Sequence, residues 1–288
     1  MRKTVLIFGY GYTAKYIAQE LIKNNYIVYG TSRKPSVNDE FDAQEIKIIK
    51  YDFESINKIL SQVNYIIISV PPDENGDIVL KDFSNILMLA KNIQWIGYLS
   101  STAVYGNHDG KIIDENSELK ISSARSKLRA LAEKQWHDFG FKKNACVNIF
   151  RLAGIYGIGR NALESVKAGT AQSIYKKDHV FSRIHVQDIT QVVVSAMKTD
   201  DKFEIYNVAD DEPCSTIEVN NYAAKLLNVN APKIIDIKDA VMSIMMQEFY
   251  ADNKRICNKK IKNKLKIKLN FPDYRAGLDD IFASVHQK

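Results

Sequence analysis

A glycine turn joins an apolar strand to a helix at the start of this chain. Residues 4–8 are a short apolar run rich in β-branched side chains, and residues 15–22 carry apolar side chains at helical spacing. The segment between them reads Gly-Tyr-Gly-Tyr-Thr-Ala over residues 9–14. Strand, glycine turn and helix in this order are typical of the first half of a βαβ unit. The chain is thereby constrained to an α/β fold with a parallel sheet.

The same turn predicts a dinucleotide site. Gly9 allows the tight turn, Gly11 lets the backbone approach a pyrophosphate, and Ala14 lets the helix pack closely on the strand. Tyr12 and Thr13 precede the expected helix, whose N-terminus offers free N–H groups and the positive end of the helix dipole to the phosphates. We therefore predict that these five residues contact the cofactor.

The residues after the second strand favour NADP. An NAD site usually has an acidic residue there to bind the ribose 2′-hydroxyl, but the strand at 26–30 is followed by Thr31, Ser32, Arg33 and Lys34. A hydroxyl and two cations suit a 2′-phosphate. The alternatives are that Arg33 and Lys34 are ordinary solvated charges and that the cofactor is NAD.

Composition limits the partners and the location. The 288 residues are 45% hydrophobic, which is enough for a large core with a smaller lobe. Cys146, Cys214 and Cys257 lie far apart, which argues against a disulfide framework or a zinc site and favours the cytoplasm. The scattered cysteines likewise mean that no metal site is expected. No apolar run approaches the ~18 residues of a membrane helix, so no membrane partner is expected.

The net charge of +6 raises the question of nucleic-acid binding, because eight Lys and Arg residues lie between Lys254 and Lys268. No aromatic side chain is interleaved with them. We interpret this basic run as a solvated surface and expect no nucleic-acid partner.

The pattern along the chain predicts a Rossmann-type doubly wound parallel sheet. Further strands are expected at 46–51, 65–70, 96–100, 146–151, 180–186 and 204–208, and helices at 82–91, 124–139, from 161, and at 188–197, 216–227, 240–248 and 273–284. We assign residues 1–155 to an NAD(P)-binding domain. Residues 156–288 are assigned to a smaller substrate lobe, interleaved with the last strands of the sheet.

Several motifs follow the glycine turn in a characteristic order, namely Leu-Ser-Ser-Thr-Ala-Val-Tyr-Gly at 99–106, Arg-Leu-Ala-Gly-Ile-Tyr-Gly at 151–157, Ile-His-Val-Gln-Asp-Ile at 184–189 and Tyr-Asn-Val-Ala-Asp at 206–210. Through these motifs, nearly the whole chain resembles the extended short-chain dehydrogenase/reductase superfamily. The resemblance is in particular to its NAD-dependent epimerase/dehydratase branch, whose members act on nucleoside-diphosphate sugars. The resemblance implies that Asp52 and Phe53 contact the adenine, and that Val70 and Pro71 form a turn beside the cofactor, although proline is unusual there.

The resemblance also implies a catalytic Ser or Thr, a Tyr acting as general acid and base, and a Lys that lowers the Tyr pKa. These positions are Ser101, Ser123 and Lys127, so a serine replaces the tyrosine. A serine hydroxyl has a pKa far above the ~10 of tyrosine and could not replace it unaided. Tyr105 and Tyr156 are candidate substitutes, each with core packing as the alternative.

Family dehydratases carry an Asp-Glu pair where this chain has Thr102 and Ala103, so we expect an epimerase or oxidoreductase rather than a dehydratase. Arg183 and Tyr156 are the predicted substrate contacts, and Asp188 is expected to cap the helix that follows it. Two functions remain open: an enzyme acting on a nucleotide sugar or related small molecule, and a redox-inactive NADP-binding regulatory or assembly protein. The sequence leaves the oligomeric state open, with a homodimer as one candidate.

Overall fold

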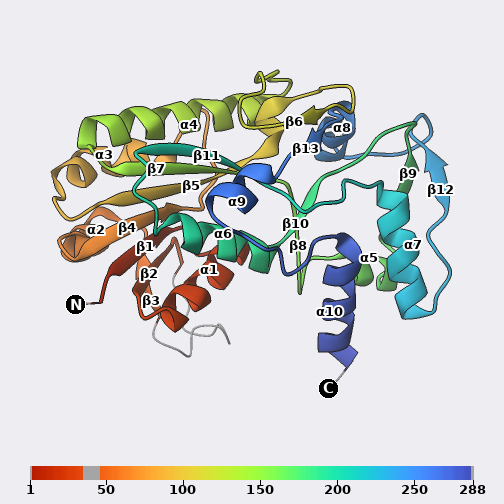
Figure 1. Cartoon of the computed structure of the whole chain (residues 1–288), viewed down its shortest axis with the longest axis horizontal. Helices are drawn as coiled ribbons and strands as arrows, with labels where there is room; N and C mark the ends of the chain where they lie inside the picture. Colours follow the sequence, from red (N-terminus) through yellow and green to blue (C-terminus); the bar gives the residue numbers. More distant parts are fainter. Residues whose placement is uncertain (1, 35–45, 287–288) are drawn as a thin grey trace. The chain divides into compact units, whose positions relative to one another are not determined.

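A computed structural model describes residues 2–34 and 46–286 of the chain (Figure 1). The chain divides into two compact units, and each unit is built from three separate segments of the sequence. Unit 1 comprises Met1–Ser101, Ala124–Arg151 and Ile189–Tyr206. Unit 2 comprises Thr102–Ser123, Leu152–Asp188 and Asn207–Lys288.

A seven-stranded parallel sheet forms the centre of unit 1, in the order β11-β7-β5-β4-β1-β2-β3. Its strands are β1 (Thr4–Phe8), β2 (Ile27–Ser32), β3 (Ile46–Lys50), β4 (Val63–Ile68), β5 (Trp95–Ser101), β7 (Cys146–Leu152) and β11 (Phe203–Val208). All five residues of β1 are buried, as expected for a central strand covered on both faces. The chain adds strands on one side of β1 and then on the other, so the sheet is doubly wound as predicted.

Helices cover both faces of this sheet, and they are α1 (Tyr12–Lys23), α2 (Phe53–Leu60), α3 (Ile78–Leu89), α4 (Ala124–Lys143) and α6 (Val186–Ala196), whose first turn belongs to unit 2. Side chains of α2, α3 and α4 share one core cluster with the sheet, including Phe83 and Trp136. On α1 the buried residues Ala14, Ile17, Ala18 and Leu21 form one helical stripe. Figure 1 shows α1 on the opposite side of the sheet from α4.

Unit 2 consists of short elements. Its helices are the 3₁₀ turn η1 (Thr102–Tyr105), α5 (Ala162–Lys167), α7 (Thr216–Leu227), α8 (Ile244–Ala251), α9 (Lys259–Lys264) and α10 (Tyr274–His286). Its strands pair in parallel as β8 (Gly154–Tyr156) with β10 (Arg183–His185), β9 (Ser173–Tyr175) with β12 (Ile234–Asp236), and β6 (Ile112–Ile113) with β13 (Arg255–Ile256). Residues of α5, α7 and α10 form its core with Tyr156 and Cys214.

The structure corrects several predicted elements. The first helix begins at Tyr12, three residues earlier than expected, because Gly11 is its N-cap. The strand predicted at 180–186 covers only Arg183–His185. The helix α2 was not predicted; Asp52 caps it by accepting a hydrogen bond from the backbone of Ser55 at 2.9 Å.

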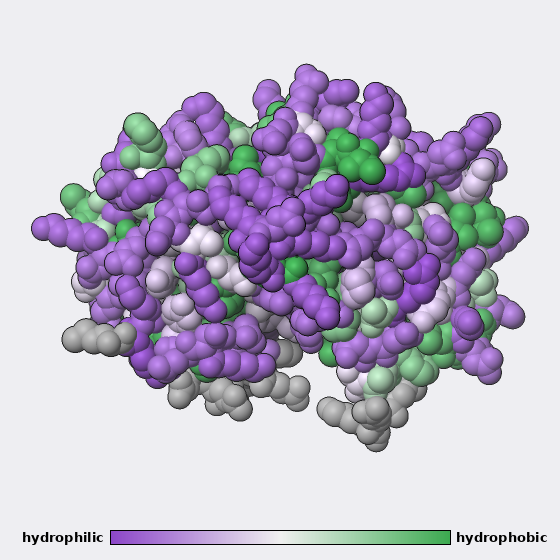
Figure 2. Space-filling view, viewed as in Figure 1, coloured by the Kyte–Doolittle hydropathy of each residue, from purple (hydrophilic) through white to green (hydrophobic). Residues whose placement is uncertain are grey.

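Hydrophilic residues cover most of the face of the molecule that Figure 2 shows. Hydrophobic residues lie on this face in small separate groups. In the described part of the chain, no helix combines the length and the apolar character needed to cross a membrane.

Candidate active site

Gly9 leaves no room for a side chain at the end of β1. Its φ of +85° is unfavourable for an L-residue, and a Cβ would lie 2.9 Å from Cγ1 of Val70. Its backbone N–H donates to Oγ1 of Thr31 at 3.0 Å. Gly9 therefore ties the carboxyl end of β1 to the residues that follow β4 and to the end of β2, beside the point where the strand order reverses.

Gly11 differs from Gly9 because the protein itself does not require a glycine there. Its φ is −97°, which any residue adopts, and no other described atom lies within 4 Å of the position of a Cβ. It begins α1 without a side-chain cap, whereas Thr13 and Ala14 are buried in the first turn. The absence of a side chain at the N-terminus of the helix leaves space for a ligand, and a pyrophosphate suits that position.

The predicted 2′-phosphate residues lie at the end of β2. Ser32 is half-buried and its Oγ accepts the backbone N–H of Lys34 at 3.2 Å. Arg33 and Lys34 are exposed, and their side chains make no hydrogen bond or ion pair with the described residues.

The predicted adenine contacts Asp52 and Phe53 begin α2. The carboxylate of Asp52 caps the helix and pairs with Lys50 at 3.2 Å, and both contacts hold the pKa of this carboxyl below its usual range. The ring of Phe53 is 57% exposed. Val70 contacts the glycine turn, and Pro71 beside it is exposed. These placements are compatible with cofactor contacts, which stay a prediction.

The catalytic candidates of unit 1 lie at β5 and α4. Ser101 is the half-buried last residue of β5, and Lys127 is exposed on α4 with no hydrogen bond or ion pair to the described residues. The cation that reaches β5 is Arg129, whose Nη1 donates to the carbonyl of Leu99 at 2.8 Å. Sequence reasoning missed Arg129, because the motif spacing pointed to Lys127, two residues away on a different face of the helix.

Tyr105 belongs to unit 2 and is fully buried. Its hydroxyl donates to Oδ1 of Asn207 at 2.7 Å. This phenol has no exposed surface, and its proton is already donated to Asn207. It therefore suits core packing better than proton exchange with a substrate.

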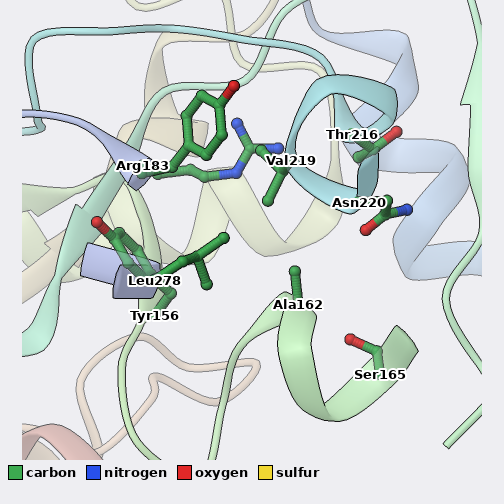
Figure 3. Close-up of a pocket in the computed structure, with 9 residues that line it drawn as sticks. Tyr156, Ala162, Ser165, Arg183, Thr216, Val219, Asn220 and Leu278 are labelled. Atoms are coloured by element: carbon green, nitrogen blue, oxygen red, sulfur yellow. The ribbon is translucent and has the colours of Figure 1, made fainter. Parts of the chain in front are cut away.

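Unit 2 contains a pocket of about 200 Å³ (Figure 3). It is lined by Tyr156, Ala162, Ser165, Arg183, Thr216, Val219, Asn220, Tyr274 and Leu278. The pocket therefore combines an apolar floor with a cation, two phenols, two hydroxyls and an amide. Such a mixture suits a small polar ligand.

Both predicted substrate contacts line this pocket. Nη1 of Arg183 donates to the carbonyls of Phe181 at 3.0 Å and Cys214 at 2.9 Å, while its other guanidinium nitrogens make no hydrogen bond with the described residues. Tyr156 donates to the carbonyl of Asp273 at 3.2 Å. Burial, together with nearby carboxylates, raises the pKa of Tyr156, so this phenol keeps its proton at neutral pH and acts as a donor.

The family model for the NAD dependent epimerase/dehydratase family matches residues 5–209. The chain belongs to this family. Its match begins on β1, includes the glycine turn and the motif at Ser101, and ends just after β11. No curated protein matches the chain.

Solved structures share the whole fold. A functionally unknown conserved protein from Silicibacter pomeroyi DSS is 38% identical over 99% of both chains, with a TM-score of 0.90. MoeE5 in complex with UDP-glucose and NAD is 17% identical over 99% of both chains, with a TM-score of 0.79. The dTDP-glucose 4,6-dehydratase from Bacillus anthracis str. Ames, solved with NAD, is 15% identical over 99% of this chain and 97% of its own, with a TM-score of 0.80.

Two buried residues of the motif at 184–189, His185 and Asp188, belong to unit 2. The ring of His185 lies between those of Tyr156 and Phe271, with centroids 5.1 and 4.0 Å away, and burial lowers the pKa of His185 to about 4. Asp188 was expected to cap α6, but this is wrong. It lies within the first turn, where its carboxylate accepts the N–H groups of Asn270 at 2.8 Å and Phe271 at 3.0 Å, and burial raises its pKa to about 6.

Proposed function

We propose that this protein is an NAD(P)-dependent oxidoreductase or epimerase that acts on a nucleotide sugar or a related small molecule. The observation that carries the proposal is the open space at Gly11 beside the filled space at Gly9, in a chain of an NAD-dependent family. A glycine that neither the backbone nor the packing demands is explained by a ligand that approaches the turn.

The cofactor in this proposal is NADP. Gly9, Gly11 and the first turn of α1 bind the pyrophosphate, and Arg33 and Lys34 bind the 2′-phosphate. Both cations are exposed and have no partner among the described residues, which supports this assignment over NAD. Residues 1–155 are the dinucleotide-binding domain and residues 156–288 the substrate lobe in the same proposal.

The substrate is bound through the pocket of unit 2. The free guanidinium nitrogens of Arg183 suit the oxygens of a diphosphate, and the hydroxyl of Tyr274 makes no hydrogen bond with the described residues. The solved complex of MoeE5 with UDP-glucose and NAD supports a nucleotide sugar as the class to test.

A bound nicotinamide would supply the hydride chemistry of such a reaction. The residues of the chain must hold the substrate oxygen and move its proton. In this proposal Ser101, the last residue of β5, supplies a hydrogen bond to that oxygen. Neither Ser123 nor the buried Tyr105 supplies an acidic proton. The proposal therefore assigns the role of proton carrier to neither residue.

The test is to load the protein with NADP or NAD and follow the nicotinamide absorbance on addition of UDP- and dTDP-sugars. The proposal predicts an absorbance change or an epimerised product with at least one sugar, and its loss in Ser101→Ala. Tight cofactor binding with no reaction across the panel contradicts it.

The replacement of the family tyrosine by Ser123 favours one alternative, a redox-inactive NADP-binding regulatory or assembly protein. This function predicts cofactor-dependent binding of a partner without turnover. The three cysteines are free thiols, which supports a cytoplasmic location in either case. A homodimer is part of the proposal and is tested by sedimentation with and without cofactor.

A further inference from the structure

The amide of Asn220 is held in one orientation at the wall of the pocket in unit 2. This side chain lies on α7 and is only 8% exposed. Its Nδ2 donates to the carbonyl of Gln172 and to Oγ of Ser173, both at 3.1 Å, so both N–H bonds of the amide are used. A half turn of the amide would set its oxygen against the carbonyl of Gln172, and the hydrogen bonds therefore fix the orientation.

The other end of this amide is an acceptor directed into the pocket. Figure 3 shows the oxygen of Asn220 towards the interior of the pocket and the nitrogen directed away from it. Among residues 2–34 and 46–286 no donor makes a hydrogen bond to Oδ1 of Asn220. A nearly buried acceptor without a donor is costly. Because this oxygen faces a cavity, the partner that fits it is a ligand that donates a hydrogen bond.

Most of the hydroxyl groups of the pocket already have partners. Oγ of Ser165 donates to a backbone carbonyl of its own helix at 2.9 Å, and the hydroxyls of Thr216 and Tyr250 lie 2.9 Å apart. The hydroxyl of Tyr156 also donates to a backbone carbonyl. A free sugar, with hydroxyl groups around its whole ring, would find few partners here. A flat ring with one N–H edge needs only the acceptor of Asn220.

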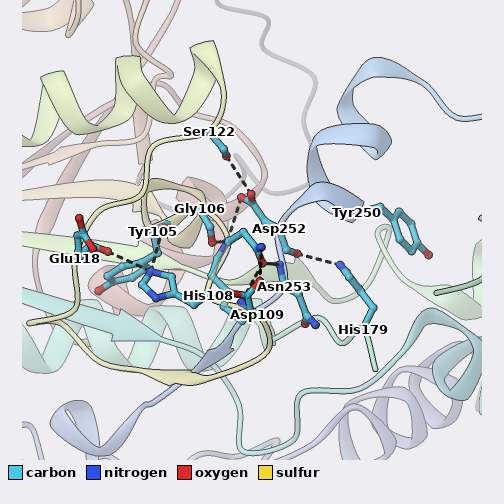
Figure 4. Close-up of polar contacts among 12 residues, drawn as sticks. Tyr105, Gly106, His108, Asp109, Glu118, Ser122, His179, Tyr250, Asp252 and Asn253 are labelled. Carbon is cyan, nitrogen blue, oxygen red and sulfur yellow. Dashed lines mark hydrogen bonds and ion pairs between the residues drawn. The ribbon is translucent and has the colours of Figure 1, made fainter. Parts of the chain in front are cut away.

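The wall of the pocket at Thr216 is connected to the loop after α8. The ring of Tyr250 stacks on that of His179, with centroids 5.2 Å apart, and Nε2 of His179 donates to the carbonyl of Asp252 at 3.0 Å (Figure 4). Asp252 pairs with Lys254 at 3.2 Å, and their side chains are only 12% and 11% exposed. The expectation that the whole basic run is a solvated surface is therefore wrong for Lys254. These contacts hold the first turn of α7 in place before a ligand binds.

Arg183 supplies the cation of the same pocket. Its Nη1 holds backbone carbonyls, which leaves the edge formed by Nε and Nη2. In unit 1 the same two atoms of Arg151 hold the carboxylate of Glu133, at 3.2 and 2.7 Å. Within the described residues that edge of Arg183 has no anion. The pocket thus combines a bidentate site for an anion with an acceptor for an N–H group.

The pocket has room for one end of a nucleotide sugar. Its volume is about 200 Å³, below the roughly 300–1,000 Å³ of sites that enclose a drug-sized ligand. Apolar side chains of Ala162, Val219 and Leu278 line it, together with the phenol rings of Tyr156 and Tyr274. Such walls suit the faces of a flat ring, and the small volume favours a single ring over the fused rings of a purine.

We propose that this pocket binds the base of the substrate and selects a pyrimidine with an imide N–H, as in uracil and thymine. The inference rests on the function proposed above. Oδ1 of Asn220 accepts the hydrogen bond of the base N3–H, and the free edge of Arg183 binds phosphate oxygens. Cytosine has an acceptor at N3, so its ring sets a lone pair against Oδ1 and leaves Asn220 without a donor. Asn220 therefore determines the base specificity.

The first test needs no variant. Calorimetric titration of the wild-type protein compares UDP with CDP and with N3-methyl-UDP, in which the imide hydrogen is replaced. We expect UDP to bind about 10-fold or more tightly than either, because both analogues leave the acceptor of Asn220 unpaired. By the same reasoning dTDP should bind more tightly than dCDP. Equal affinities for UDP and its two analogues, or no binding of UDP, overturn the inference.

The second test assigns the selectivity to Asn220. Asn220→Ala removes the acceptor, so affinity for UDP should fall about 10-fold while affinity for CDP stays nearly the same, and their ratio should approach one. A purely structural role would lower both affinities together and leave the ratio unchanged, which overturns the inference. Asn221→Ala is the matched control, because this neighbour on α7 is exposed, and it should keep the wild-type ratio.

Failure of this inference and failure of the proposed function give different results. Turnover of a sugar nucleotide with no preference between uracil and cytosine overturns the base specificity and leaves the proposed function intact. Imide-selective binding of UDP by a protein that binds its cofactor but turns over no sugar contradicts the proposed function, and still supports the role of Asn220.

Discussion

The guanidinium of Arg151 pairs with the carboxylate of Glu133 inside unit 1, with Nη2 and Oε2 2.7 Å apart and side chains 4% and 7% exposed. Nε of Arg151 lies 3.2 Å from both oxygens of the same carboxylate. Ser100 adds a hydroxyl donor at 2.5 Å. The pair links α4 to the ends of β5 and β7, which gives Arg151 a structural role at the start of the motif at 151–157.

Breaking this pair should destabilise the protein strongly. Glu133→Gln keeps the shape but removes the carboxylate charge that pairs with Arg151 in the interior, and we expect a loss of about 3 kcal/mol in the free energy of unfolding. The exposed pair of Lys134 and Asp138 is the control, since its side chains are 72% and 44% exposed. Lys134→Gln should change stability by less than about 0.5 kcal/mol. Equal urea midpoints for the two variants would contradict the assignment.

The buried imidazole of His185 should make stability fall in acid. Its folded-state pKa of about 4 lies below the ordinary value of 6.5, so between these values the unfolded chain binds a proton that the folded chain does not. Stability is therefore lost as pH falls from 6.5 towards 4, by about 3 kcal/mol from this group.

His185→Phe keeps an aromatic ring between Tyr156 and Phe271 and removes the titration. The difference in unfolding free energy between wild type and variant should depend on pH over this window. The opposing effect of Asp188, whose pKa is raised to about 6, is present in both proteins and cancels. His137→Gln is the control, because this side chain is 46% exposed. Parallel stability curves for wild type and His185→Phe would contradict a lowered pKa of His185 in the folded state.

The two glycines of the turn should respond in opposite ways. Gly11→Ala adds a methyl group to open space, so stability should change by no more than about 1 kcal/mol, while affinity for NADPH should fall about 10-fold. Gly9→Ala places a methyl group against Val70 in a strained backbone conformation, so this variant should be less stable than Gly11→Ala. Thermal unfolding and NADPH fluorescence titration measure the two effects. Unchanged NADPH affinity in Gly11→Ala would remove the main support for the cofactor site.

The choice of cofactor should depend on Arg33. Arg33→Ala removes a charge-assisted contact to the 2′-phosphate, so we expect affinity for NADP to fall about 10-fold while affinity for NAD stays the same. Arg2→Ala is the matched control, since Arg2 donates to the backbone carbonyls of Asn25 and Tyr26, which precede β2, and so lies away from the predicted phosphate site at the end of that strand. A parallel loss of both affinities, or of neither, would assign Arg33 to another role.

The features that the sequence predicts well are local. The strand of residues 4–8, the glycine turn and the first helix follow from neighbouring residues, because glycine conformation and hydrophobic spacing act over a few positions. The short helix α2 was missed, because the motif resemblance assigned Asp52 to the adenine and hid its role as an N-cap.

The remaining features depend on tertiary contacts. Glu133 and Arg151 are 18 residues apart, and only the folded sheet brings them together. Lys254 is more than 140 residues from Gly106, and its place in a basic run suggested a solvated surface. A charged residue at a buried position is recognised only when its partner is known, and the partner is set by packing.

Calorimetric titration of the purified protein with NADPH and with NADH tests the central claim most directly. The account predicts one binding site per chain, with heat on addition of NADPH and weaker binding of NADH. No heat with either nucleotide would contradict the dinucleotide site at the glycine turn and everything that depends on it.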